Sequence, residues 1–207
     1  YGRAKTRLLM PRARLMTHLL NILRLCVCCG MLAACAGAPL APKDIPPRPA
    51  RETVSSFAIN ARAVIKQGGK ANALRIMWEH TADTDNIGFA SPLTGMIAEL
   101  QRDRGGARWI SAEGEHYEAR TADLLIARLT SEPVPIAALA RWITGQTSAG
   151  ASEVVRDNQG RLLQALDKGW QIRVLSYETE LPNAMPSVME VESETLLIRL
   201  AFEEYVI

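Results

Sequence analysis

The stretch FAINARAVIKQGGKANALRIMW, residues 57–78, decides the fold. In its first half every second residue is apolar, which is typical of a half-buried strand. Gln67-Gly68-Gly69-Lys70 then has the composition of a hairpin turn. In the second half Leu74, Ile76 and Trp78 share one face of a second strand. The stretch therefore predicts two antiparallel strands with one buried face.

The remainder of the chain after this hairpin alternates short apolar segments with turns. It predicts nine further strands, at 87–90, 96–101, 107–111, 116–119, 153–156, 161–165, 170–177, 188–192 and 195–202. Between the two groups, Thr121 is a plausible N-cap for a helix over 122–129, and a second helix is expected over 136–143. We expect a mainly β (α+β) domain over 52–207: an antiparallel sheet of about eleven strands that curls and is covered on its open side by helices.

The first 34 residues have the features of an export signal. They contain six Lys or Arg and no Asp or Glu, and the apolar run 25–34 is too short to span a bilayer. The chain begins with Tyr1, and we expect initiation at Met10 or Met16. Leu32-Ala33-Ala34-Cys35 resembles a lipobox, which predicts a signal peptide over 1–34 and a diacylglycerol and an N-acyl chain on Cys35. The alternative is an ordinary secreted protein with an unmodified cysteine.

Removal of the signal would change the composition of the chain. The 24 basic residues become 24 − 6 = 18 against 22 acidic ones, a net charge of −4, so no nucleic-acid footprint is expected. Cys26, Cys28 and Cys29 lie in the signal, and only Cys35 would remain, so no disulfide within the chain is expected. Residues 35–51 are rich in Pro and predict an extended tether.

The predicted domain lacks the usual signatures of catalysis and metal binding. His80 and His116 fall in separate polar turns, where we expect them to be solvated, and no ligand cluster is visible, so no metal is expected. No Gly-x-Ser-x-Gly elbow or glycine-rich phosphate loop occurs. The carboxylates at 113 and 115 and at 190, 192 and 194 lie two apart on strands. They indicate solvated faces, with a catalytic pair as the alternative.

The apolar residues are more informative. Trp78, Trp142 and Trp170 fall on a strand, a helix and a strand, and they are either ordinary core aromatics or the wall of a cavity under the helices. Leu93 stands at the tip of a Pro-Thr-Gly turn, where a polar residue is usual. It is either ordinary surface or a side chain that enters a membrane interface.

Several short stretches run in order along nearly the whole chain, at 91–93 (SPL), 114–117 (GEHY), 133–136 (PVPI), 139–145 (LARWITG) and 184–186 (AMP). Together with Cys35 they resemble one family, the LolB lipoprotein receptors of the outer membrane. The chain departs from the family pattern at Thr94, which stands before Gly95, and at Tyr205, where members tend to carry Trp.

The resemblance implies an unclosed β-barrel with a helical lid over an apolar cavity. Such a protein takes triacylated lipoproteins from a periplasmic LolA-like carrier and inserts them into the outer membrane, as a monomer without cofactor or catalysis. The implied cavity residues are Leu74, Ile76, Trp78, Leu125, Trp142 and Trp170. Leu93 would insert into outer-membrane lipid. Ala36, which is not the Asp of inner-membrane retention, implies a lipid anchor on the periplasmic face of the outer membrane.

Two other classes of function remain open from the residues alone. A structural or assembly lipoprotein would bind another envelope protein and have no acyl-binding cavity. A lipid-active hydrolase would need a nucleophile, and no nucleophile motif is present.

Overall fold

The computed structural model describes residues 45–130 and 132–207. The predicted signal peptide, Cys35 and the first part of the predicted tether lie outside the described residues.

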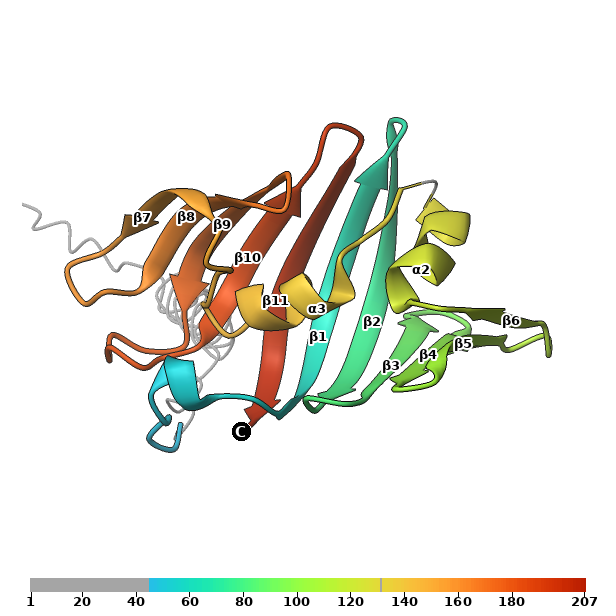
Figure 1. Cartoon of the computed structure of the whole chain (residues 1–207), viewed down its shortest axis with the longest axis horizontal. Coiled ribbons are helices and arrows are strands. Elements are labelled where there is room, and N and C mark those ends of the chain that lie inside the picture. The colour runs from blue at the N-terminus through green and yellow to red at the C-terminus, as the bar shows by residue number, and fades with distance from the viewer. Residues whose placement is uncertain (1–44, 131) are drawn as a thin grey trace, which may run out of the picture. The chain divides into compact units, whose positions relative to one another are not determined.

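The described chain forms one antiparallel sheet of eleven strands (Figure 1). Its strands are β1 (Phe57–Gln67), β2 (Lys70–His80), β3 (Asp85–Ser91), β4 (Gly95–Asp103), β5 (Gly106–Ser111), β6 (His116–Ala119), β7 (Ser152–Arg156), β8 (Leu162–Asp167), β9 (Trp170–Tyr177), β10 (Pro186–Glu192) and β11 (Leu196–Val206). The spatial order is β6-β5-β4-β3-β2-β1-β11-β10-β9-β8-β7. The first and last strands therefore pair at the centre, and the sheet stays open between its edges β6 and β7. The predicted fold class is confirmed.

Two α-helices cover one face of this sheet (Figure 1). The chain must cross from one edge, β6, to the other, β7, and it does so through α2 (Ala122–Thr130) and α3 (Ile136–Trp142). Thr121 caps α2 as predicted, since its hydroxyl accepts a bond from the backbone N–H of Leu124 at 3.4 Å. Neither helix in this part of the chain is long and apolar enough to cross a membrane.

The β1–β2 hairpin has the predicted turn, at Gln67–Lys70. Gly68 and Gly69 have φ of +56° and +76°, a backbone that side chains rarely adopt, which explains the two glycines. Ile59 pairs with Trp78 across the two strands. The apolar residues of each strand therefore face the helices, and the residues that alternate with them face outward.

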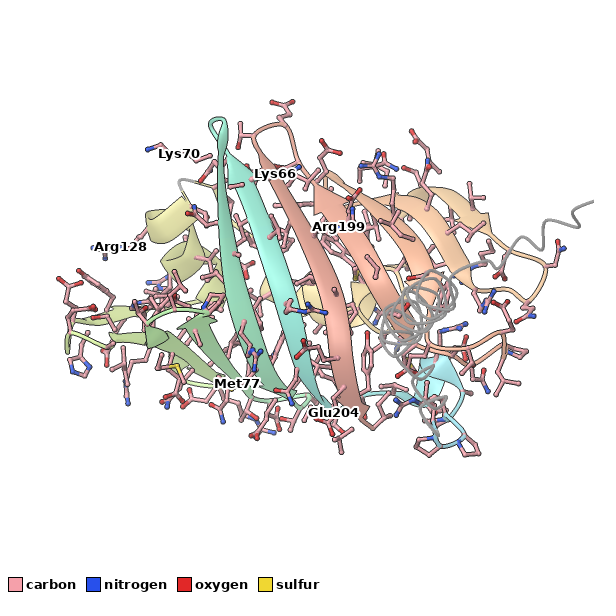
Figure 2. The ribbon with its side chains drawn as sticks, turned by 180° about the vertical axis from the view of Figure 1, so that it is seen from behind. Lys66, Lys70, Met77, Arg128, Arg199 and Glu204 are labelled. Carbon is pink, nitrogen blue, oxygen red and sulfur yellow. The ribbon has the colours of Figure 1, made fainter. Side chains whose placement is uncertain are left out.

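The opposite face of the sheet is charged (Figure 2). Arg173 donates to Glu190 and Glu192 at 3.0 and 3.2 Å, and Arg199 donates to Glu190 at 3.2 Å. Ion pairs of this kind contribute little to stability but keep the surface polar. The carboxylates at 190 and 192 thus engage arginines on the outer face, away from the helices.

The folded part begins before the expected boundary at residue 52. Residues 45–51 pack on the domain, where the guanidinium groups of Arg48 and Arg51 find partners far away in sequence. Arg48 donates two bonds to the carboxylate of Glu178, at 2.7 and 3.0 Å. Arg51 is 7% exposed and donates to the carbonyl of Ala184 at 2.7 Å. The Pro-rich composition predicted an extended chain but carried no sign of these contacts.

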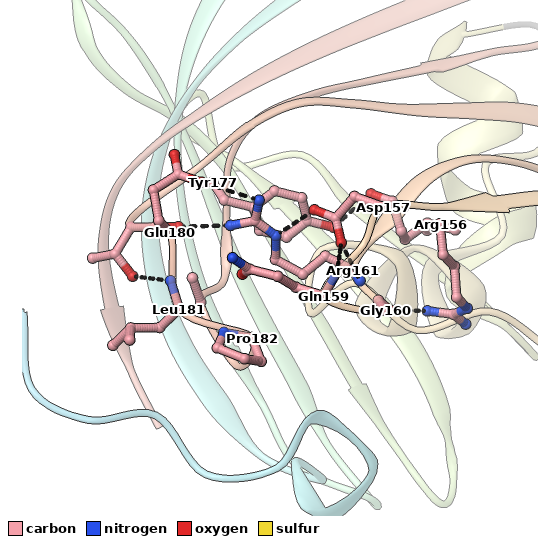
Figure 3. A network of polar contacts seen from close by, with 12 residues as sticks. Arg156, Asp157, Gln159, Gly160, Arg161, Tyr177, Glu180, Leu181 and Pro182 are labelled. Carbon is pink, nitrogen blue, oxygen red and sulfur yellow. Dashed lines mark hydrogen bonds and ion pairs between the residues drawn. The ribbon is translucent and has the colours of Figure 1, made fainter.

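A polar network beside this segment joins strands β8 and β9 to the turn before β8 (Figure 3). Arg161 donates to the carboxylate of Asp157 at 2.6 Å, and its guanidinium lies 4.6 Å from the ring centre of Tyr177. Arg51 lies 5.4 Å from the same ring. Burial raises the pKa of Tyr177 to about 12, so its hydroxyl stays protonated and donates to the carbonyl of Leu162 at 2.5 Å.

Candidate functional site: an apolar cavity beneath the helices

A cavity of about 170 Å³ lies between the sheet and the helices. All its lining residues are apolar except Thr130. They are Ile59, Ile65, Leu74, Ile76, Trp78, Ile87, Phe89, Ile97, Trp109, Ile126, Thr130, Val134, Ile136, Leu139, Ile198 and Leu200. Such a lining offers an acyl chain burial without hydrogen-bond partners.

Strand alternation explains most of this lining, and a β-bulge explains one more residue. The register of β3 against β4 shifts between Phe89 and Ala90. Phe89 pairs with Ala98 and Ala90 pairs with Met96, so Ile97 is the extra residue. A bulge re-aims a side chain, and Ile97 here joins the cavity wall.

Few polar contacts hold the end of the helical cover to the strand tips. The side-chain amide of Gln67, at the end of β1, donates to the carbonyl of Thr130 at the end of α2. The hydroxyl of Thr195, before β11, donates to Glu132. Each such bond contributes about 0.5–1.5 kcal/mol, so this attachment is weak.

Behind Trp78 lies a buried ionic cluster centred on Asp85. The Asp85 side chain is fully buried and accepts bonds from the indole N–H of Trp78 at 2.8 Å, from His80 Nδ1 at 2.6 Å, and from Arg102. The His80 ring also stacks on Phe57, with ring centres 4.9 Å apart. The cluster fixes the indole that forms this wall of the cavity.

A second hollow of about 340 Å³ lies on the other side of α2, and we call it the α2 groove. It is lined by Ile97, Trp109, Ser111, Glu113, Glu115, Tyr117, Leu125 and Arg128. Two of these residues, Ile97 and Trp109, also line the cavity. The cavity and the groove are therefore separated by α2 and by these two shared side chains.

Comparison with known proteins identifies the family. A family described as outer membrane lipoprotein LolB matches residues 55–205. The chain belongs to the LolB family.

Its LolB relatives cover most of the chain. An outer-membrane lipoprotein LolB of Azoarcus sp. is 29% identical over 181 residues, 87% of this chain and 92% of the relative. That of Dechloromonas aromatica is 28% identical over 181 residues, 84% and 92% of the two chains. Among solved structures, a DUF1329 family protein from Desulfovibrio piger is similar in fold, with a TM-score of 0.50 and 15% identity over 75% of this chain and 86% of that one.

The structure brings together three of the six cavity residues implied by the LolB resemblance. Leu74, Ile76 and Trp78 line the cavity side by side along β2. Leu125 instead lines the α2 groove, because its side chain leaves α2 about 100° around the helix axis from that of Ile126, which lines the cavity.

Trp142 and Trp170 lie outside the lining, and their assignment to the cavity is corrected. Their ring centres are 6.4 Å apart, and Trp142 is fully buried and donates from its indole N–H to Asp167 at 2.9 Å. They form a separate packed part of the core beneath α3. The sequence placed Trp142 on a helix that covers the sheet but did not indicate which strands that helix covers.

His80 is a second correction, because it is not a solvated turn residue. Its ring is 17% exposed and bonded to Asp85, whereas His116 is exposed as predicted. In residues 45–130 and 132–207, no three His, Cys, Asp or Glu side chains are grouped to hold a metal ion. The role of His80 is therefore that of a partner to a buried carboxylate.

Leu93 is 94% exposed in the turn between β3 and β4. The hydroxyl of Ser91 accepts bonds from the backbone N–H groups of Leu93 and Thr94, at 3.1 and 3.2 Å. Gly95 then leaves the turn with φ of +82°. Ser91 thus orders the loop with Thr94 in place, and the predicted exposure of Leu93 is confirmed.

The buried carboxylates predict the acid sensitivity of the fold. Burial disfavours ionisation of Asp85, but bonds from His80, Arg102 and Trp78 outweigh it and lower the pKa of Asp85. A lowered pKa stabilises the fold above the unfolded value of about 3.9 and is lost as pH falls through the native pKa. We expect the free energy of unfolding in urea to fall as the pH drops below about 4, and Asp85→Asn to make that fall shallower.

The matched control for this titration is Asp83→Asn, at a carboxylate that is half exposed in the same turn. It should leave the acid dependence nearly unchanged. An Asp85→Asn protein with the same slope as wild type would contradict the assignment.

Proposed function

We propose that this LolB-family lipoprotein accepts the acyl chains of lipid-modified proteins from a periplasmic carrier and delivers them to the outer membrane. The observation that carries the proposal is the apolar cavity beneath the helices, closed at one end by few hydrogen bonds. Sheet residues supply its wall and the helices supply its movable cover.

The size of the cavity requires the cover to move. A dry apolar cavity of about 150 Å³ accommodates a ligand of benzene size, and drug-sized ligands occupy about 300–1,000 Å³. At about 170 Å³ the cavity is too small for a full acyl chain. We therefore infer that α2 and α3 shift outward on loading, with loss of the Gln67–Thr130 and Thr195–Glu132 bonds.

Transfer of this kind needs no catalysis. Each buried methylene contributes about 0.8 kcal/mol, so a chain of roughly fifteen carbons gains about 12 kcal/mol on leaving water. Release into water would be very slow, and the chain must pass directly from one apolar site to the next. A receptor of intermediate affinity between carrier and bilayer is sufficient, and neither a nucleotide nor a catalytic group is required.

The same proposal includes the anchor and the partners. A diacylglycerol and an N-acyl chain on Cys35 would hold the protein on the periplasmic face of the outer membrane, the destination that Ala36 favours. A LolA-like carrier would supply triacylated lipoproteins to a monomeric receptor. No other cofactor is proposed.

Leu93 is the residue that we propose to enter the membrane interface. Its burial would contribute about 2 kcal/mol, which is enough to orient a protein that is already lipid-anchored. Because the side chain makes no core contact, Leu93→Glu should fold normally and load lipoprotein from the carrier. Delivery into liposomes should fail. Loading is scored in solution, and incorporation is scored by flotation with vesicles.

The matched control is Leu175→Glu, the same change at another exposed leucine on β9 (47% exposed). It should load and deliver as wild type does. Delivery by Leu93→Glu at the wild-type rate would show that the loop is ordinary surface. Failure of the wild-type protein to load would overturn the proposed function itself.

A further inference from the structure

The α2 groove adjoins the cavity and lies near the Leu93 loop. Ile97, which lines both hollows, is the third residue of β4 and follows Leu93 by four residues. Its carbonyl accepts a bond from the backbone N–H of Ala112 at 2.7 Å. The turn that carries Glu113 and Glu115 on the rim of the groove therefore lies beside the start of β4, next to the loop.

Trp109, which lies between the cavity and the groove, has fewer polar contacts than Trp78 and Trp142. The indole N–H groups of Trp78 and Trp142 are bound to the buried carboxylates of Asp85 and Asp167. Within the part of the chain that the structure describes, the indole N–H of Trp109 has no such partner, and its ring rests tilted on Phe89 at 5.3 Å. Rotation of Trp109 would break no hydrogen bond in these residues.

The groove has the chemistry of a passage for a lipid. Its floor is apolar, with Ile97, Trp109 and Leu125, and its rim is polar. On that rim the guanidinium of Arg128 lies 4.7 Å from the ring centre of Tyr117. Acyl chains could move along such a floor while the polar linkage between the chains and the cargo peptide faces the rim.

We propose that the α2 groove is the exit route along which acyl chains leave the cavity for the membrane, with Trp109 as its gate. Loading would occur at the other end of the cavity, beneath the loosely held end of the cover. The inference rests on the proposed function and adds a direction to it: the cargo enters beside Thr130 and leaves beside Leu93.

A removable plug in the groove tests this route. Tyr117→Cys, made in the full-length lipidated chain, places a thiol in the lining of the groove, where a bulky maleimide can be attached. The probe is a synthetic triacylated cysteine lipopeptide with a fluorophore. Loading onto the protein and release into vesicles of phosphatidylethanolamine and phosphatidylglycerol are measured separately. Arg75→Cys, exposed on the outer face, carries the same label as the control.

With the label at position 117, loading should be unchanged and release should be about tenfold slower, because a filled groove leaves no free volume in a densely packed wall. The label at position 75 should change neither step. Release at the unlabelled rate, or loss of loading with the label at 117 alone, would overturn the route and leave the proposed function standing. Loss of loading by unlabelled wild type would overturn the proposed function. If unlabelled Tyr117→Cys does not fold, Arg128→Cys carries the same label on the rim.

Discussion

Leu74→Glu is expected to weaken acyl binding strongly while the protein remains folded. Leu74 lines the cavity but is only half buried, so the substituted side chain can reach water in the unloaded protein. A bound acyl chain would trap the carboxylate against hydrocarbon without a partner. That costs several kcal/mol, so we expect affinity to fall by about 100-fold or more, equivalent to about 3 kcal/mol. The measurement is a titration with a fluorescent triacylated lipopeptide.

Ala73→Glu is the matched control for this variant. The alanine precedes Leu74 on β2, is exposed, and points to the opposite face of the sheet. The same charge there should leave the affinity unchanged. Equal losses in both variants would mean that the effect is one of net charge or stability, not of the cavity.

Trp142→Ala should cause the largest loss of stability of any variant considered. The side chain is fully buried, packs on Trp170 and donates to Asp167, so its removal leaves a cavity and a buried carboxylate with one partner fewer. Truncation of a buried Trp typically costs about 3–5 kcal/mol, a large share of the usual 5–15 kcal/mol. Urea unfolding followed by circular dichroism measures the loss.

Trp142→Phe separates packing from hydrogen bonding in this test. It retains most of the ring volume but cannot donate to Asp167, and it should cost about 1–3 kcal/mol. Both variants, once folded, should bind the acyl probe with wild-type affinity. A Trp142→Ala protein that kept its free energy of unfolding and lost acyl binding would show that Trp142 lines the cavity.

The sheet could be predicted from sequence because its signal is local. The apolar alternation in β1 and β2 and the glycine pair between them determine both the turn and the buried face. Each later strand has its own short alternation and turn. The observed ends of most elements differ from the predicted ends by a few residues. For example, β11 extends to Val206 rather than to residue 202.

The cavity was only partly predictable because the position of a helix across the sheet is not determined by the local sequence. The buried face of α3 follows from helical spacing, yet whether Trp142 meets the cavity or Trp170 depends on where the connection crosses eleven strands. The pairing of Asp85 with Trp78, His80 and Arg102 likewise needs three strands in register. No spacing in the chain signals it.

The composition of the N-terminal segment could not predict its long-range contacts. Arg48 and Arg51 sit among prolines that favour an extended chain. Their partners are a carboxylate and carbonyls about 130 positions away, in the loop between β9 and β10. Residues 48–51 therefore belong to the folded part, ahead of the expected start at residue 52.

Photo-crosslinking tests most directly the claim that the cavity holds the acyl chains of lipoproteins. A benzophenone amino acid is placed at Ile76, within the cavity wall, or at Glu192, on the outer face of the sheet, and the protein is loaded from a lipoprotein-bearing carrier. Mass spectrometry then locates the adduct. We predict a one-to-one adduct on an acyl chain from position 76 and none from position 192. Equal labelling from both positions, or adducts on the cargo peptide alone, would contradict the account.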